Sequence, residues 1–144
     1  MHPNAKDRKL LVLAVIATLF SIGHHIDHIV RGNHVGWPLI PQITPFTVSL
    51  GFYPVIALGF YLYIRGRVGP GFWAILSLLG VLFVGLLHFG PLAVEPPKDI
   101  LGAYSNPVTG WLAFGWLLVF LIVLVVTTIY SCRLWLQQRT TGNA

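Results

Sequence analysis

Charged residues are scarce in this 144-residue chain: Asp, Glu, Lys and Arg together make up 9% of it, against about 25% in a typical soluble protein. Hydrophobic residues make up 56%, and the mean hydropathy is +0.77. So few charges cannot cover a surface that faces water, which excludes an ordinary soluble globular domain. We therefore expect the lipid bilayer to surround most of a single domain that covers residues 1–144.

Cysteine is nearly absent, and this excludes an intrachain disulfide. The one cysteine, Cys132, ends the last apolar run, where a small apolar residue fits. Acidic residues are also few, four against nine Lys and Arg, and the formal net charge is +5. The basic residues flank the apolar runs and form no stripe, so the charge predicts membrane anchoring and no nucleic-acid partner.

Four apolar runs are long enough to cross a bilayer, which takes about 20 residues in a helix. The first follows a basic segment, as in a signal peptide, but it is longer than the apolar core of such peptides, so we expect it to be retained. The pattern predicts an all-α integral membrane protein, a four-transmembrane-helix bundle with helices near 10–30, 46–64, 71–94 and 108–132.

The distribution of basic residues predicts the orientation of this bundle. Seven of the nine Lys and Arg lie in the N-terminal tail, in the short loop at 65–67 and in the C-terminal tail. Loops rich in Lys and Arg remain in the cytoplasm. We therefore expect both termini to be cytoplasmic, the chain to lie in the cell (cytoplasmic) membrane, and its first and third loops to be outside.

Proline and tryptophan mark local features of the predicted spans. Pro54 should kink the second helix and free a backbone carbonyl, and Pro91 should act near the exit of the third. Tryptophans near span ends favour the headgroup region, where an indole ring is partly in lipid and partly in water. We expect that anchoring role for Trp37, Trp73, Trp111 and Trp135.

One ionisable stripe follows the first predicted helix. At about 100° per residue, its polar side chains fall on one face and isoleucines take the opposite face. The stripe consists of Ser21, His24, Asp27, His28 and Arg31, with His25 at its border. Ionisable groups in a membrane are costly when they face lipid, so we expect this stripe to face the bundle interior or a water-filled cavity.

The spacing within the stripe allows two kinds of pairing. His24 and His28 are four residues apart, close enough on a helix to share one metal ion. Asp27 could fix the tautomer of a histidine or be a ligand itself. Asp27 and Arg31, also four residues apart, could instead neutralise each other as an ion pair.

The third predicted helix supplies another histidine at a matching depth. At about 1.5 Å per residue, His24 lies about 21 Å from the cytoplasmic start of its helix and His88 about 25 Å from the start of its own. The two helices run in the same direction, so the depths can be compared directly. We expect His24, His28 and His88 to converge in the outer half of the membrane.

The leading interpretation is a transition-metal site with His24, His28, His88 and Asp27 as ligands, because imidazole suits zinc, iron and copper. Three histidines with an open position would let zinc bring the pKa of a bound water to about 7. That chemistry would make the protein a metal-dependent hydrolase acting on a lipid-like or extracytoplasmic substrate, whereas iron or copper would make it an oxidoreductase. Catalytic roles are expected for Asp27, Glu95 and His34. Glu95 or His34, which follow their helix ends closely, would carry a proton, and Asp27 would bind the metal or orient a ligand.

Three further interpretations stay open. A b-type haem needs one axial histidine from each of two helices, which His24 or His28 and His88 could supply, and would make the protein an electron carrier. The cluster could also belong to a metal or proton transport or sensing subunit. Finally, it could be a polar packing network that sets helix register. A thin four-helix bundle also leaves room for a homodimer or a larger membrane complex.

Overall fold

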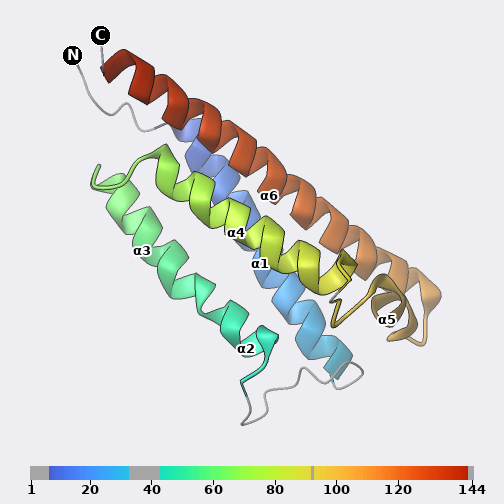
Figure 1. Ribbon diagram of the computed structural model, residues 1–144. Helices are drawn as coiled ribbons and strands as arrows, with labels where there is room; N and C mark the ends of the chain where they lie inside the picture. The colour runs from blue at the N-terminus through green and yellow to red at the C-terminus, as the bar shows by residue number, and fades with distance from the viewer. Residues whose placement is uncertain (1–6, 33–42, 92, 143–144) are drawn as a thin grey trace.

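The computed structural model describes residues 7–32, 43–91 and 93–142, and these residues form helices and connections with no strand among them. The helices are α1 (Arg8–Arg31), α2 (Pro45–Leu50), α3 (Phe52–Ile64), α4 (Pro70–Phe89), α5 (Pro97–Gly102) and α6 (Pro107–Gly142). Figure 1 shows them side by side, with both ends of the chain at the same end of the molecule. The predicted all-α class is confirmed.

Four segments of the described chain are long and apolar enough to cross a membrane, as predicted: Arg8–Arg31, Pro45–Ile64, Pro70–Phe89 and Pro107–Thr141. Helices α1, α4 and α6 pack together, and the pair α2–α3 lies beside them (Figure 1). In an apolar 18-residue stretch of the second span, 11% of the residues are buried, against 22% in the corresponding stretch of each other span. The second span is therefore the most loosely packed wall of the bundle.

The second span breaks where proline requires it. Pro54 has no N–H to donate to the carbonyl of Leu50, the residue four positions earlier, and its ring crowds that carbonyl. Accordingly α2 ends at Leu50, and α3 begins at Phe52 after Gly51. The interruption divides the span into a short and a long helix, and the predicted kink stays a prediction.

The third span is shorter than predicted. Helix α4 ends at Phe89 and not near residue 94, because the Gly90-Pro91 sequence disfavours helix at the residue before the proline. The chain then folds back, and the backbone N–H groups of Val94 and Glu95 donate to the carbonyl of Leu87 at 3.0 and 3.1 Å. This reversal positions Glu95 over the end of α4.

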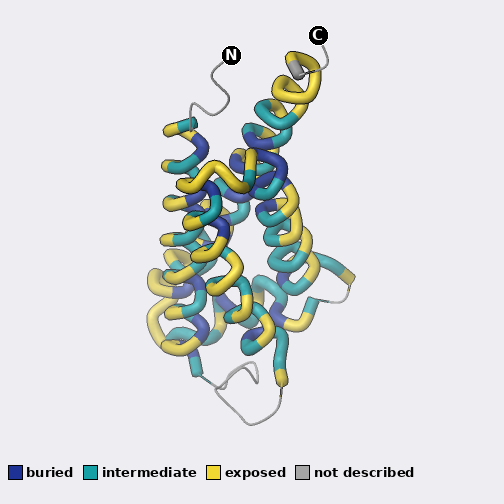
Figure 2. The backbone as a smooth tube through the Cα atoms, turned by 90° about the vertical axis from the view of Figure 1, so that its left-hand side faces the viewer, coloured by how far each residue is buried: buried dark blue, intermediate teal, exposed yellow. Residues whose placement is uncertain are grey.

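The fourth span is longer than predicted. Helix α6 runs past residue 132 to Gly142, 36 residues in all, since neither proline nor glycine interrupts it there. At about 1.5 Å per residue it is about 54 Å long, against a hydrocarbon thickness of about 30 Å. Its last turns are exposed and extend beyond the other helices (Figure 2).

The ends of the helices near the two termini are joined by polar contacts. Asp7 caps α1: its Oδ1 accepts from the Leu10 N–H at 2.9 Å. Its Oδ2 accepts from the Tyr130 hydroxyl at 3.0 Å, and its N–H donates to the Tyr63 hydroxyl at 3.1 Å. One acidic residue thus connects α1 with α3 and α6.

Trp73 does not take the headgroup position expected of it. It is 4% exposed and packs against Leu10, Ala14 and Tyr63 in an apolar cluster at this end of the bundle. Trp111, in contrast, is 62% exposed, and Trp37 lies outside the described residues.

Candidate metal centre

Three buried histidines meet between α1 and α4. His24 and His28 occupy successive turns of α1, His88 lies in the last turn of α4, and the three are 5%, 7% and 3% exposed. One ring nitrogen of each lies within 4.8 Å of the others. The Nε2 atoms of His24 and His28 are 3.2 Å apart. The predicted convergence of these three residues is confirmed.

Aromatic side chains close the histidine cluster on two sides. The Phe120 ring of α6 has its centroid 5.8 Å from that of His24, and the Phe46 ring of α2 has its centroid 5.7 Å from that of His28. Both rings are nearly inaccessible, at 4% and 2% exposed. The imidazoles are therefore held in a largely apolar surrounding, where charge and hydrogen-bond interactions are stronger than in water.

The backbone of Glu95 fixes the tautomer of His88. The Nδ1 of His88 lies 2.9 Å from the carbonyl oxygen of Glu95. Because a carbonyl oxygen only accepts, Nδ1 carries the proton and donates it, which leaves Nε2 as the unprotonated nitrogen. A metal-binding histidine typically makes such a bond with its other ring nitrogen. The chain reversal after α4 therefore prepares His88 to be a ligand.

The carboxylate of Glu95 lies against the same cluster. Glu95 is fully buried, and its Oε1 accepts from Nη1 of Arg31. Its Oε2 is 3.4 Å from Nε2 of His28 and 3.5 Å from Nδ1 of His88. Within the described part of the chain, Oε2 has no hydrogen-bond partner. Glu95 thus folds back over the histidines.

Asp27 is linked to the histidine cluster through Arg31 and Glu95. It is not in the group of three histidines whose ring nitrogens converge. Its Oδ2 accepts from Nε of Arg31 at 2.7 Å, which confirms the predicted ion pair, and its Oδ1 accepts from the hydroxyl of Tyr104. Arg31 therefore joins Asp27 to Glu95. A direct metal bond from Asp27 stays a prediction.

Tyr104 is a site residue that the sequence did not indicate. It lies in the connection from α5 to α6, 77 positions from Asp27. Burial and its hydrogen bond to the Asp27 carboxylate raise the pKa of Tyr104 to about 12. No periodicity links a loop tyrosine to a distant helix face, so only the packing of α5 against α6 could disclose this contact.

His25 and His34 do not belong to the cluster as described. His25 points toward α2–α3: its Nε2 lies 2.7 Å from the Ser49 hydroxyl, and its Nδ1 lies 2.8 Å from the Tyr53 hydroxyl. The same Nδ1 is 2.8 Å from the Ser21 carbonyl oxygen. His25 therefore connects α1 with the loosely packed second span. His34 lies outside the described residues, and its expected catalytic role stays a prediction.

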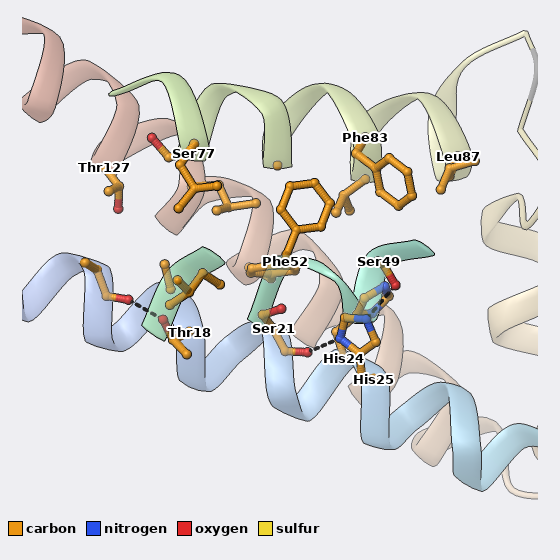
Figure 3. A pocket seen from close by; sticks show the side chains of 18 of the residues that line it. Thr18, Ser21, His24, His25, Ser49, Phe52, Ser77, Phe83, Leu87 and Thr127 are labelled. Atoms are coloured by element: carbon orange, nitrogen blue, oxygen red, sulfur yellow. Dashed lines mark hydrogen bonds between the residues drawn. The ribbon is translucent and has the colours of Figure 1, made fainter. Parts of the chain in front are cut away.

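A cavity of about 90 Å³ extends from the histidines into the bundle. Its walls come from α1, α2, α3, α4 and α6, and they include His24, His28 and His88. Figure 3 shows His24, His25 and Ser49 at one end and Thr18, Ser77 and Thr127 toward the other, with Phe52 between them and Phe83 across from the histidines. The histidine cluster therefore forms one end of this cavity.

The spacing of the histidines fits a tetrahedral metal ion. Zinc–nitrogen distances of about 2.0–2.1 Å and a tetrahedral angle give about 3.3–3.4 Å between two ligand nitrogens. The 3.2 Å between His24 and His28 is close to this value, and His88 completes the group within 4.8 Å. A fourth position would remain for water or another small group beside Glu95.

Comparison with models of protein families, with curated proteins and with solved structures gives no match to this chain. The arrangement of its own side chains is therefore the basis for the function proposed below.

Proposed function

We propose that this chain is a multi-pass protein of the cytoplasmic membrane that binds one transition-metal ion through His24, His28 and His88, with zinc as the preferred metal. The observation that carries the proposal is the convergence of three buried imidazole nitrogens within 4.8 Å. The positive-inside rule places both termini in the cytoplasm. The metal centre then lies toward the extracytoplasmic side.

The charge around the cluster supports a bound cation. The Oε2 of the buried Glu95 carboxylate lies 3.4 Å from His28 Nε2 and 3.5 Å from His88 Nδ1, and no hydrogen bond within the described residues satisfies it. A buried acceptor without a partner is costly, and a polar network that served only packing would satisfy it. A divalent cation between the histidines would place positive charge next to the Glu95 Oε2.

We assign the chemistry to a metal-dependent hydrolase. A zinc ion held by three imidazoles supplies a Lewis acid and activates water at neutral pH. Glu95 lies where its Oε2 would take the proton of that water, and Arg31 holds the carboxylate in place through Oε1. Asp27 orients Arg31 and is a positioning residue, together with Tyr104.

The same residues offer a weaker case for haem b. A porphyrin separates its two axial imidazoles, whereas the rings of His24 and His88 have centroids 5.1 Å apart and lie edge to face. Those of His28 and His88 are 5.9 Å apart. This compact cluster favours a single ion over a porphyrin. Iron or copper, and a transport or sensing role, remain outcomes of the test below.

Metal analysis of the purified protein tests the proposal. The full chain, purified in detergent through a tag that binds no metal, is expected to hold about one zinc ion per chain. His24→Ala and His88→Ala should each remove it, because three ligands become two. His25→Ala is the matched control, since His25 is the neighbour of His24 but bonds toward α2–α3, and it should keep the ion.

The same samples distinguish the alternatives. Another stoichiometric metal would move the assignment to redox chemistry, and a Soret band in the optical spectrum would favour haem. Equal metal content in the wild type and all three variants would contradict the three-histidine site. A packing network predicts lower stability in the variants with no change in any bound species.

A further inference from the structure

The cavity beside the histidines has one polar end and one that is effectively apolar. Away from the histidines its hydroxyl groups belong to Thr18, Ser77 and Thr127. Each donates its proton to the backbone carbonyl four residues earlier in its own helix, at 2.6 to 2.8 Å. With these bonds made, the far end needs no polar ligand group, and its remaining walls are aliphatic and aromatic.

The cavity is long and narrow. Its lining residues extend over about 21 Å along α1, from Ala14 to His28, and about 22 Å along α4, from Trp73 to His88, at about 1.5 Å per residue. Its volume of about 90 Å³ would hold roughly six to nine water molecules, or a hydrocarbon segment of about that many carbons. A space of these dimensions fits one alkyl chain and is too small for two.

The cavity wall that the second span forms offers a route from the lipid. Phe46 and Ser49 of α2 and Phe52 and Ile56 of α3 line the cavity, and this is the span with the fewest buried residues. The break at Gly51 lies in the same wall. A chain that leaves the bilayer therefore meets the part of the bundle that is least packed against its neighbours.

We infer that the cavity binds a single-chain amphiphile, with its polar head at His24, His28 and His88 and its alkyl chain extending toward Trp73. This inference rests on the proposed function, because it names the substrate class of the same metal centre. The two proposals can nevertheless be tested separately, because the alkyl chain would contact apolar residues that are not metal ligands. A two-chain lipid and a water-soluble substrate fit this space less well.

Photolabelling tests where the chain lies. Two probes, octanoic acid and octanol, each carry a diazirine on the terminal carbon; they share the alkyl chain and differ in the head group. With the full protein chain in phosphatidylcholine nanodiscs, labels mapped by mass spectrometry should fall in the apolar part of the cavity, near Thr18 and Ser77. The probe that labels more strongly identifies the preferred head group.

A pair of glycines in α4 provides a matched control. Gly80 lines the cavity, and a Cβ added there would lie 3.4 Å from Leu124. Gly80→Leu should block the passage and exclude about four methylene groups, which corresponds to roughly a hundredfold weaker binding. Gly85→Leu should label as the wild type does, because a Cβ at Gly85 meets nothing within 4 Å. Val84→Phe, which also fills the cavity, provides a second blocking variant.

Metal content measured on the same samples separates the two proposals. Gly80→Leu should lose cavity labelling and keep zinc, whereas His24→Ala should lose zinc. Cavity labelling without zinc in any sample would uphold the chain site and overturn the metal proposal. Labels confined to lipid-facing residues such as Leu78 and Leu82 would overturn the chain site even if zinc binds. Labelling of both blocking variants at the wild-type level would overturn it as well.

Discussion

Removal of the Arg31 charge provides the sharpest test of the arrangement around Glu95. The side chain of Arg31 is 1% exposed and that of Glu95 is fully buried, and the two form an ion pair. Loss of one partner leaves the other charge buried without compensation, which costs about 3–5 kcal/mol. We therefore expect Arg31→Met to lower the free energy of unfolding by about that amount.

A second substitution should reverse much of this loss. In Arg31→Met combined with Glu95→Gln, the fully buried carboxylate no longer carries a charge, and only Asp27, whose side chain is 14% exposed, is left without its ion partner. Replacing both partners of a buried pair is often close to neutral. The double variant should be more stable than Arg31→Met alone. Zinc should also stabilise Arg31→Met, because a cation between the histidines would supply positive charge beside Glu95.

Reversible unfolding in mixed micelles, followed by tryptophan fluorescence, measures these free energies. Lys98→Met removes the same charge from an exposed position and should change stability by no more than about 0.5 kcal/mol. The reasoning is refuted if Arg31→Met and Lys98→Met have equal effects. It is also refuted if the effects of Arg31→Met and Glu95→Gln simply add in the double variant, since a contacting pair must show coupling.

Two further predictions concern other parts of the structure. The pKa of Tyr104 is raised from 10.0 to about 12. The contribution of Tyr104 to stability is therefore present below pH 10 and is lost as the pH rises through about 12. Unfolding of the wild type and of Tyr104→Phe across this pH range measures that contribution, and parallel stability curves would contradict the prediction. Gly23→Ala places a methyl group against the ring of Trp116, and overpacking of this kind costs about 1–3 kcal/mol. Gly85→Ala, where the added methyl group meets open space, should instead be neutral or stabilising by up to about 1 kcal/mol. Thermal unfolding compares the two variants, and equal unfolding midpoints would count against the contact between α1 and α6.

The four spans, the break near Pro54 and the meeting of His24, His28 and His88 follow from local rules and simple geometry. Apolar length determines which segments can cross a bilayer, and proline acts on the residues just before it. The rise per residue sets the depth of a side chain in a straight helix. The predicted ion pair between Asp27 and Arg31 has the same origin, since both residues lie on one helix face.

The contacts of Glu95, Tyr104 and Trp73 were decided by tertiary structure. Glu95 reaches the histidines because α4 stops at Phe89 and the chain reverses, while Tyr104 meets Asp27 only through the placement of α5 against α6. Trp73 is buried by neighbours from other helices. Each of these contacts joins residues whose relative position no helical period specifies, and the cavity between the helices exists only once their side chains are packed.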